Sequence, residues 1–152
     1  MENAKSLAYQ YAKMEIEQFA FFEENYKEGS DIGFNNMVQF AFDTKQCIIR
    51  CNITVNMESE GKPLLKSSFN NYFLIKEDSL QSLLDDGKYV FPVNVLVQFA
   101  SLSYGSLRGV IFAKTQGTKL NSIVLPPYYM NEIISLGDKI SFSEIIFDFD
   151  SE

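Results

Sequence analysis

One long helical pattern, with prolines before and after it, most constrains the fold of this chain. Over residues 91–112 the apolar side chains recur at three- and four-residue spacing, which predicts an amphipathic helix. Pro92 suits the first turn of a helix, where its missing N–H costs nothing. Further along, Pro126 and Pro127 exclude both a helix and a central strand. The chain must therefore cross over in an extended conformation after the long helix.

Alternating apolar residues before this helix predict antiparallel strands. The cleanest period-two pattern covers residues 47–55, and its partner over 65–75 follows a charged loop, 57–63, that contains Gly and Pro. So short a connection implies antiparallel pairing. Two more strands are predicted over 38–42 and 14–22, and the latter shifts phase at its phenylalanines. Such a shift indicates a β-bulge.

The remaining segments complete a single α+β domain over residues 1–152. Residues 1–13 are expected to form either a frayed lead-in or a short helix. Residues 78–84 offer N-capping residues and a short helix that ends near Asp86-Gly87. A second short helix is predicted over 129–136, after the crossover. It is followed by an atypical apolar tail, 137–152, that we expect to be ordered.

Charge and hydropathy exclude several classes of partner. Twenty acidic against thirteen basic residues give a net charge of −7, which repels phosphate backbones and argues against a nucleic-acid partner. No uninterrupted apolar run reaches membrane-spanning length, and the first residues lack a secretory pattern. We therefore expect a cytoplasmic protein without membrane insertion. The 14 Phe and 8 Tyr favour an exposed apolar groove or a subunit interface.

The sequence shows no group of residues that is typical of catalysis or metal binding, although carboxylates and lysines alone can serve an enzyme. The chain has no His, so Ser–His and Cys–His nucleophiles and His-bearing metal sites are excluded. Cys47 and Cys51 lie roughly 13 Å apart on one predicted strand, too far for a disulfide. The paired carboxylates read as solvated faces or turns, and no phosphate-binding glycine motif occurs. We expect neither an enzyme nor a bound cofactor or metal.

The order of the predicted strands, helix and crossover resembles that of the SecB export-chaperone family. The similar residues include a helix that opens near Phe91-Pro92 and closes on Arg108-Gly109, then Leu120-Asn121 and the crossover from Leu125 to Met130. Residues 11–16 are similar to the family's first strand, and the paired long strands match as well. The resemblance covers roughly residues 9–135.

The resemblance implies both an architecture and a function. The implied fold is a four-stranded antiparallel sheet with the long helix and a short C-terminal helix on one face, in a homotetramer built as a dimer of dimers. The implied function is that of a cytosolic holdase, which binds unfolded polypeptides in apolar grooves without nucleotide or catalysis. The missing catalytic groups, the aromatic excess and the acidic charge agree with it.

The resemblance also implies site residues. The client-binding groove would be lined by residues of the first two strands and of the crossover: Phe19, Phe21, Phe22, Phe40, Phe42, Leu125, Pro126, Tyr128, Tyr129 and Met130. Apart from the resemblance, four acidic residues at the first strand form either a solvated strand face or an anionic face for a cationic partner: Glu15, Glu17, Glu23 and Glu24. The family's tail is polar where it meets the Sec translocase motor, whereas this tail is apolar, so a partnership with that motor stays open.

Two other functions fit the same parts. A SecB-like chaperone dedicated to one client, such as an antitoxin, is favoured by the altered tail. A small-ligand-binding or hot-dog-type domain also places a long helix against an antiparallel sheet. A catalytic carboxylate or His would then be expected on the helix, and residues 91–112 contain no Asp, Glu or His.

Overall fold

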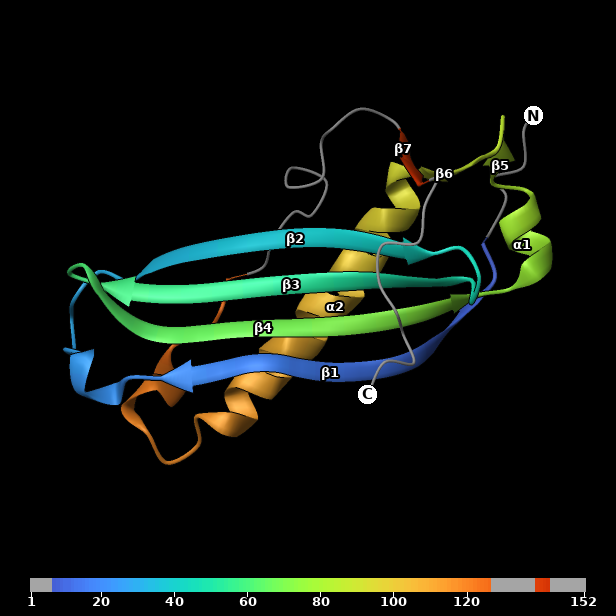
Figure 1. Cartoon of the computed structure of the whole chain (residues 1–152). Coiled ribbons are helices and arrows are strands. Elements are labelled where there is room, and N and C mark those ends of the chain that lie inside the picture. Colours follow the sequence, from blue (N-terminus) through green and yellow to red (C-terminus); the bar gives the residue numbers. More distant parts are fainter. Residues whose placement is uncertain (1–6, 127–138, 143–152) are drawn as a thin grey trace.

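A four-stranded antiparallel sheet with one long helix across its face dominates the structure, a computed structural model that describes residues 7–126 and 139–142 (Figure 1). The strand order is β1-β4-β3-β2, so β1 and β2 are the two edges. Every neighbouring pair runs antiparallel, as the sequence predicts. The strands are β1 (Tyr9–Phe21), β2 (Gly33–Asp43), β3 (Ile48–Ser59) and β4 (Lys62–Ile75).

The strands are longer than the sequence predicts. The β3–β4 connection is only Glu60 and Gly61, both with positive φ (53° and 77°), so the predicted loop over 57–63 is wrong. Such a two-residue turn matches the twist of the strands and lets their ladder continue to its end. β1 already begins at Tyr9, which pairs with Ile75, so residues 9–13 are neither frayed nor helical.

The predicted bulge exists, but it occurs earlier in the first strand. The β1–β4 register shifts between Tyr11 and Lys13 and again between Ile16 and Gln18. The prediction placed the shift at Phe19, Phe21 and Phe22, because the alternation of apolar residues breaks there in the sequence. The two extra residues keep Tyr11, Met14, Ile16 and Phe21 opposite residues of β4 that face the helix.

The helix predicted around residue 80 ends earlier than expected, and a small second sheet follows it. α1 is confined to Glu77–Gln81, and β5 (Leu84–Asp85) and β6 (Lys88–Pro92) form a hairpin behind it. Asp86 and Gly87, both with positive φ, make its turn. β7 (Lys139–Phe142) pairs antiparallel with the other edge of β6, so the described part of the tail is a strand. The helix predicted over 129–136 lies outside the described residues.

α2 (Val93–Lys114) crosses one face of the four-stranded sheet diagonally, from the end of β2 toward the end of β1 (Figure 1). Phe91, predicted to open this helix, belongs to β6, and Pro92 is the N-cap residue. We call the covered side of the sheet the helix face and the other side the outer face. Side chains of α2 and of the helix face form the core, including Phe99, Leu96, Leu107, Phe73 and Ile53.

Only one side of α2 meets the sheet. A Cβ added at Gly105 or Gly109 would meet nothing within 4 Å, so these small residues do not serve a close approach to the protomer's own sheet. Leu102 and Phe112 are exposed on the same helix. By length and composition alone α2 is apolar enough to cross a membrane, a test that the core helix of a soluble protein also passes. Because its sheet-facing side is buried, including Leu96, Phe99 and Leu107, we interpret α2 as a core helix.

Candidate functional site

Exposed apolar side chains gather along β1 on the helix face of the sheet. α2 crosses diagonally and leaves this edge strand partly uncovered, so Tyr11, Met14, Ile16 and Phe21 remain 40–60% exposed. Large apolar side chains on one face of an edge strand are a recognised mark of an interaction site. We call these four residues the β1 stripe.

A hollow near the C-terminal half of α2 adds a second apolar surface. Its volume is about 340 Å³, and it is formed where residues 123–125 pass beside the helix. Phe112 and Val124 are among its most exposed side chains. The hydroxyl of Tyr104 donates a hydrogen bond to the carbonyl oxygen of Pro126 and so ties the crossover to α2. Its lining residues are Gly105, Arg108, Gly109, Ile111, Phe112, Ile123, Val124 and Leu125.

The predicted groove residues fall into separate environments. Phe21 is exposed in the β1 stripe, while Phe19 beside it is half-buried, with the Lys114 ammonium 5.5 Å from its ring centroid. Phe22 and Phe40 are also half-buried. Leu125 lines the hollow but is itself almost fully buried. Tyr128, Tyr129 and Met130 lie outside the described residues.

Phe42 requires a correction, because its side chain has no exposed surface. Its ring packs edge-on against Phe91 of β6, at 5.3 Å between centroids, and against Tyr89 at 5.4 Å. The hairpin of β5 and β6 therefore covers the end of β2. Because no strand was predicted at β6 and Phe91 was assigned to the long helix, nothing in the sequence indicated that Phe42 is buried; we now assign it to the core.

Sequence reasoning missed three members of the β1 stripe: Tyr11, Met14 and Ile16. Their alternation was visible, but it is equally typical of a core-facing strand. What exposes them is the edge position of β1 together with the diagonal course of α2. Neither property is encoded in the local pattern.

Two of the four predicted partner-facing acids form one polar cluster on the outer face. Glu15 Oε1 accepts hydrogen bonds from Asn70 Nδ2 (3.1 Å) and from the Tyr72 hydroxyl (3.2 Å). Glu17 Oε2 accepts hydrogen bonds from Asn52 Nδ2 (3.2 Å) and from other donors of the central strands, including Ser68 at 3.1 Å. Glu15 is also paired with Lys13 at 3.5 Å. These carboxylates are held in place by the sheet.

The other two acids lie elsewhere. Glu23 Oε1 accepts a hydrogen bond from the backbone N–H of Lys119 (2.8 Å), which joins η1 (Glu23–Asn25) to η2 (Lys119–Ser122). Glu24 is exposed. The four acids therefore do not make one anionic patch.

The polar cluster makes stability depend on pH. Hydrogen bonds from Asn70, then Tyr72 and Lys13, hold the pKa of Glu15 below its ordinary value of 4.5. A depressed pKa in the folded state contributes stability above pH 4.5, and that stability is lost as pH falls through the folded value.

We expect Glu15→Gln to lose less unfolding free energy than the wild type between pH 7 and pH 3, as measured by urea unfolding. Glu24→Gln is the matched control; if it flattens the profile as much, the cluster is not the cause.

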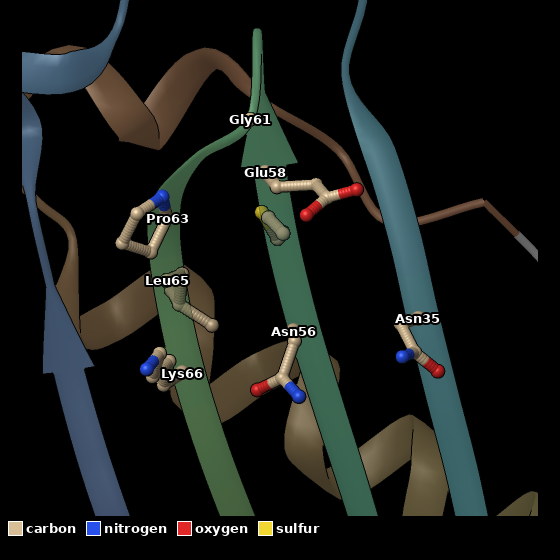
Figure 2. Close-up of a pocket in the computed structure, with 8 residues that line it drawn as sticks. Asn35, Asn56, Glu58, Gly61, Pro63, Leu65 and Lys66 are labelled. Atoms are coloured by element: carbon tan, nitrogen blue, oxygen red, sulfur yellow. The ribbon is translucent and has the colours of Figure 1, made fainter.

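A second hollow, of about 300 Å³, lies near the β3–β4 turn. Figure 2 shows Asn35, Asn56 and Lys66 on three neighbouring strands, with Glu58 further along β3. Asn56 pairs with Asn35 on one side and with Lys66 on the other. This end of the outer face is polar, and Asn35, Glu58 and Lys66 are exposed.

The described residues offer little chemistry for a reaction. Burial raises the pKa of the Cys51 thiol to about 12, so it stays protonated at neutral pH. Cys47 is half-buried, and burial raises its pKa as well. Within residues 7–126 and 139–142, no group of three or more His, Cys, Asp or Glu side chains is placed to hold a metal ion.

Comparison with known proteins rests on structure alone. No family model matches the chain, and no curated protein matches it. The fold is similar to that of the Mycobacterium tuberculosis SecB-like chaperone Rv1957, solved in complex with a ChAD peptide from the antitoxin HigA1. The TM-score is 0.52 at 10% sequence identity, over 79% of this chain and 87% of the other. At so low an identity the likeness shows the fold alone: this chain has the fold of SecB-like chaperones.

Proposed function

We propose that this protein is an ATP-independent holdase chaperone, which binds non-native polypeptides through apolar side chains on its helix face. The observation that carries the proposal is the β1 stripe, in which Tyr11, Met14, Ile16 and Phe21 are exposed along one edge strand. The SecB-like fold and the chaperone role of the similar structure support it. No chemical bond is made or broken in this activity, so the protein is not an enzyme.

The arrangement suits clients without a common sequence. Burial of apolar surface is non-directional, and one fully buried side chain contributes about 1.5–3 kcal/mol. A dissociation constant near 1 μM corresponds to about 8 kcal/mol, before the costs of ordering the client are met. Several anchors are therefore needed, and a row of exposed side chains supplies them better than a single pocket. The edge of β1 can add backbone hydrogen bonds to an extended client.

Assembly and cellular role follow from the SecB resemblance. We infer a cytoplasmic homo-oligomer, arranged as a dimer of dimers, that serves protein export. Glu15 and Glu17 are the acids that a cationic partner, such as the Sec translocase motor, would meet, since both lie on the outer face. Glu23 is less suited, because its carboxylate is already bonded to the Lys119 N–H.

A dedicated role is the second candidate function. The similar structure was solved with a peptide from an antitoxin, which favours a chaperone that serves one such client. The two roles differ in selectivity. A general holdase suppresses aggregation of several unrelated unfolded proteins at similar ratios, whereas a dedicated one protects a single client.

The holdase proposal predicts a difference between two methionines. Met14 and Met37 are both exposed on edge strands (60% and 47%), but Met14 lies on the helix face and Met37 on the outer face. We expect Met14→Asp to raise, by about tenfold, the concentration that half-suppresses aggregation of a chemically unfolded client, which corresponds to about 1.4 kcal/mol of lost binding. Met37→Asp should leave that concentration unchanged.

Circular dichroism and light scattering on both variants exclude unfolding and disassembly as causes. Equal suppression by the two variants would refute binding at the β1 stripe. A wild-type protein that suppresses no aggregation, whatever its client, would refute the holdase function.

A further inference from the structure

A fully buried asparagine on the helix face has no partner for its side-chain amide. The central strands β3 and β4 bury Asn52, Asn70 and Asn71. On the outer face, Asn52 Nδ2 donates a hydrogen bond to Asn70 Oδ1 (2.7 Å). Asn71 lies on the helix face with no exposed surface, and among the residues that the structure describes neither its Oδ1 nor its Nδ2 has a hydrogen-bond partner. An unpaired buried amide destabilises a fold, so its presence calls for an explanation.

Asn71 lies in the same row of the sheet as the most exposed member of the β1 stripe. It pairs with Met14 of β1 on one side and with Cys51 of β3 on the other. Met14 is 60% exposed. Side chains directly opposite each other in an antiparallel pair have Cβ atoms about 4.5–5.5 Å apart. Met14 is therefore the exposed neighbour of the amide, and rotation of this flexible side chain would open a way to it from the stripe.

The polar side chains of α2 near this row are already bonded. Ser103 lies beside Cys51, and Ser106 lies beside Tyr11 of the β1 stripe. The Ser103 hydroxyl donates to the carbonyl oxygen of Phe99 (2.7 Å), and the Ser106 hydroxyl donates to that of Leu102 (3.0 Å). Neither proton is offered to the Asn71 carbonyl oxygen. The helix therefore covers the amide without satisfying it.

We propose that Asn71 binds the backbone of an extended client, an inference that rests on the proposed holdase function. The asparagine amide presents one acceptor and a donor side by side. In an extended chain the N–H and C=O groups of one residue point to the same side. A client that lies along the β1 stripe beside α2 and displaces the Met14 side chain can therefore donate its N–H to Asn71 Oδ1. Its C=O accepts a hydrogen bond from Asn71 Nδ2.

Such a contact selects for conformation and not for sequence. Every residue except proline carries both backbone groups, so Asn71 places no demand on the client's side chains. A folded protein has already paired most of its buried N–H and C=O groups internally, whereas an unfolded chain has them free. Apolar contacts alone would also hold a folded protein by an apolar surface patch. Asn71 would add a preference for extended, unpaired backbone to the non-directional grip of the stripe.

Asn71→Leu tests the inference, because leucine has a similar branched shape without a donor or an acceptor. We expect the urea midpoint of unfolding to rise, since the variant no longer buries an unpaired amide. In the same variant, the concentration that half-suppresses aggregation of a chemically unfolded client should rise about fivefold, as the loss of one or two hydrogen bonds would cause. A more stable but weaker chaperone is the expected signature. Binding of an anilinonaphthalene sulfonate dye should not weaken, because the dye needs apolar surface and not an amide.

Two further variants control for packing and position. Asn71→Ala removes the amide without adding volume, and it should weaken suppression as Asn71→Leu does. Asn36 of β2 provides the matched control, since both of its side-chain amide atoms are also buried without a partner. It lies on the same face but pairs with Val55, in the edge strand opposite β1. Asn36→Leu should raise the urea midpoint and leave suppression unchanged.

The outcomes separate this inference from the holdase proposal. Unchanged suppression by Asn71→Leu and Asn71→Ala, with Met14→Asp still weakened, would overturn the role of Asn71 and leave the holdase standing. That result would assign the amide to the interior of the fold, with a buried water as its partner. Equal weakening by Asn36→Leu would also overturn the inference, because the effect would then not depend on the place beside Met14. A wild-type protein that suppresses no aggregation would refute both.

Discussion

Replacing Phe73 with alanine is expected to lower the free energy of unfolding by about 3–5 kcal/mol, the usual cost of removing a fully buried aromatic ring. Phe73 of β4 has no exposed surface and joins three parts of the molecule. Its ring stacks on Phe99 of α2 at 4.4 Å and contacts Tyr9 and Tyr11 of β1 at 5.7 and 4.6 Å. The lost ring would leave a cavity between the sheet and the helix that neither can close alone.

Urea unfolding followed by circular dichroism measures this loss. Phe112→Ala is the matched control, because it removes the same ring from α2 where the side chain is 59% exposed. We expect that control to cost about 0.5 kcal/mol or less, as is usual for surface positions. A similar cost for both variants would mean that the helix does not pack on the sheet through Phe73.

Phe42→Ala is expected to cost a similar 3–5 kcal/mol, although the sequence alone suggested a groove residue. The structure buries Phe42 completely between β2 and the β5–β6 hairpin, against Tyr89 and Phe91. A groove residue would show the reverse behaviour, with unchanged stability and weaker client binding. Thermal unfolding and the aggregation assay, run on the same variant, separate the two roles.

Phe21→Ala serves as the comparison for Phe42→Ala. Phe21 was predicted for the same groove and is 40% exposed in the β1 stripe. We expect it to cost about 1 kcal/mol or less in stability, while the concentration needed for half-suppression rises. If Phe42→Ala proved as stable as Phe21→Ala, the hairpin would not be packed on the end of β2.

The strands and the long helix were predictable because apolar residues recur with a different spacing in each kind of element. The alternation over 47–55 and 65–75 could only be satisfied by strands with one buried face, and the spacing of residues 91–112 only by a helix. The order of these parts then carried the SecB resemblance, and the structural comparison confirms the fold. Element ends were less predictable. Glu60-Gly61 and Asp86-Gly87 have positive φ and form tight turns. The charged residues beside each turn therefore stay in the paired strands, where the sequence predicts a loop or a helix end.

The site was less predictable than the fold, because exposure depends on what lies across a strand. Phe40 and Phe42 have the same residue type and local pattern, yet only Phe42 is sealed by β6. Met14 and Ile16 alternate as core residues do, and only the diagonal course of α2 leaves them open. The exposure of these side chains depends on contacts between segments distant in sequence, which the local spacing of apolar residues does not reveal.

The two register shifts in β1 have a consequence for the holdase function that we propose. A flat, regular edge strand with large apolar side chains would template further strands without limit, and fibrous aggregates would grow from it. An extra residue at each bulge twists the strand and breaks the repeat of its hydrogen-bonding groups. The irregular edge of this sheet therefore permits brief contact with an extended chain while it discourages open-ended polymer growth.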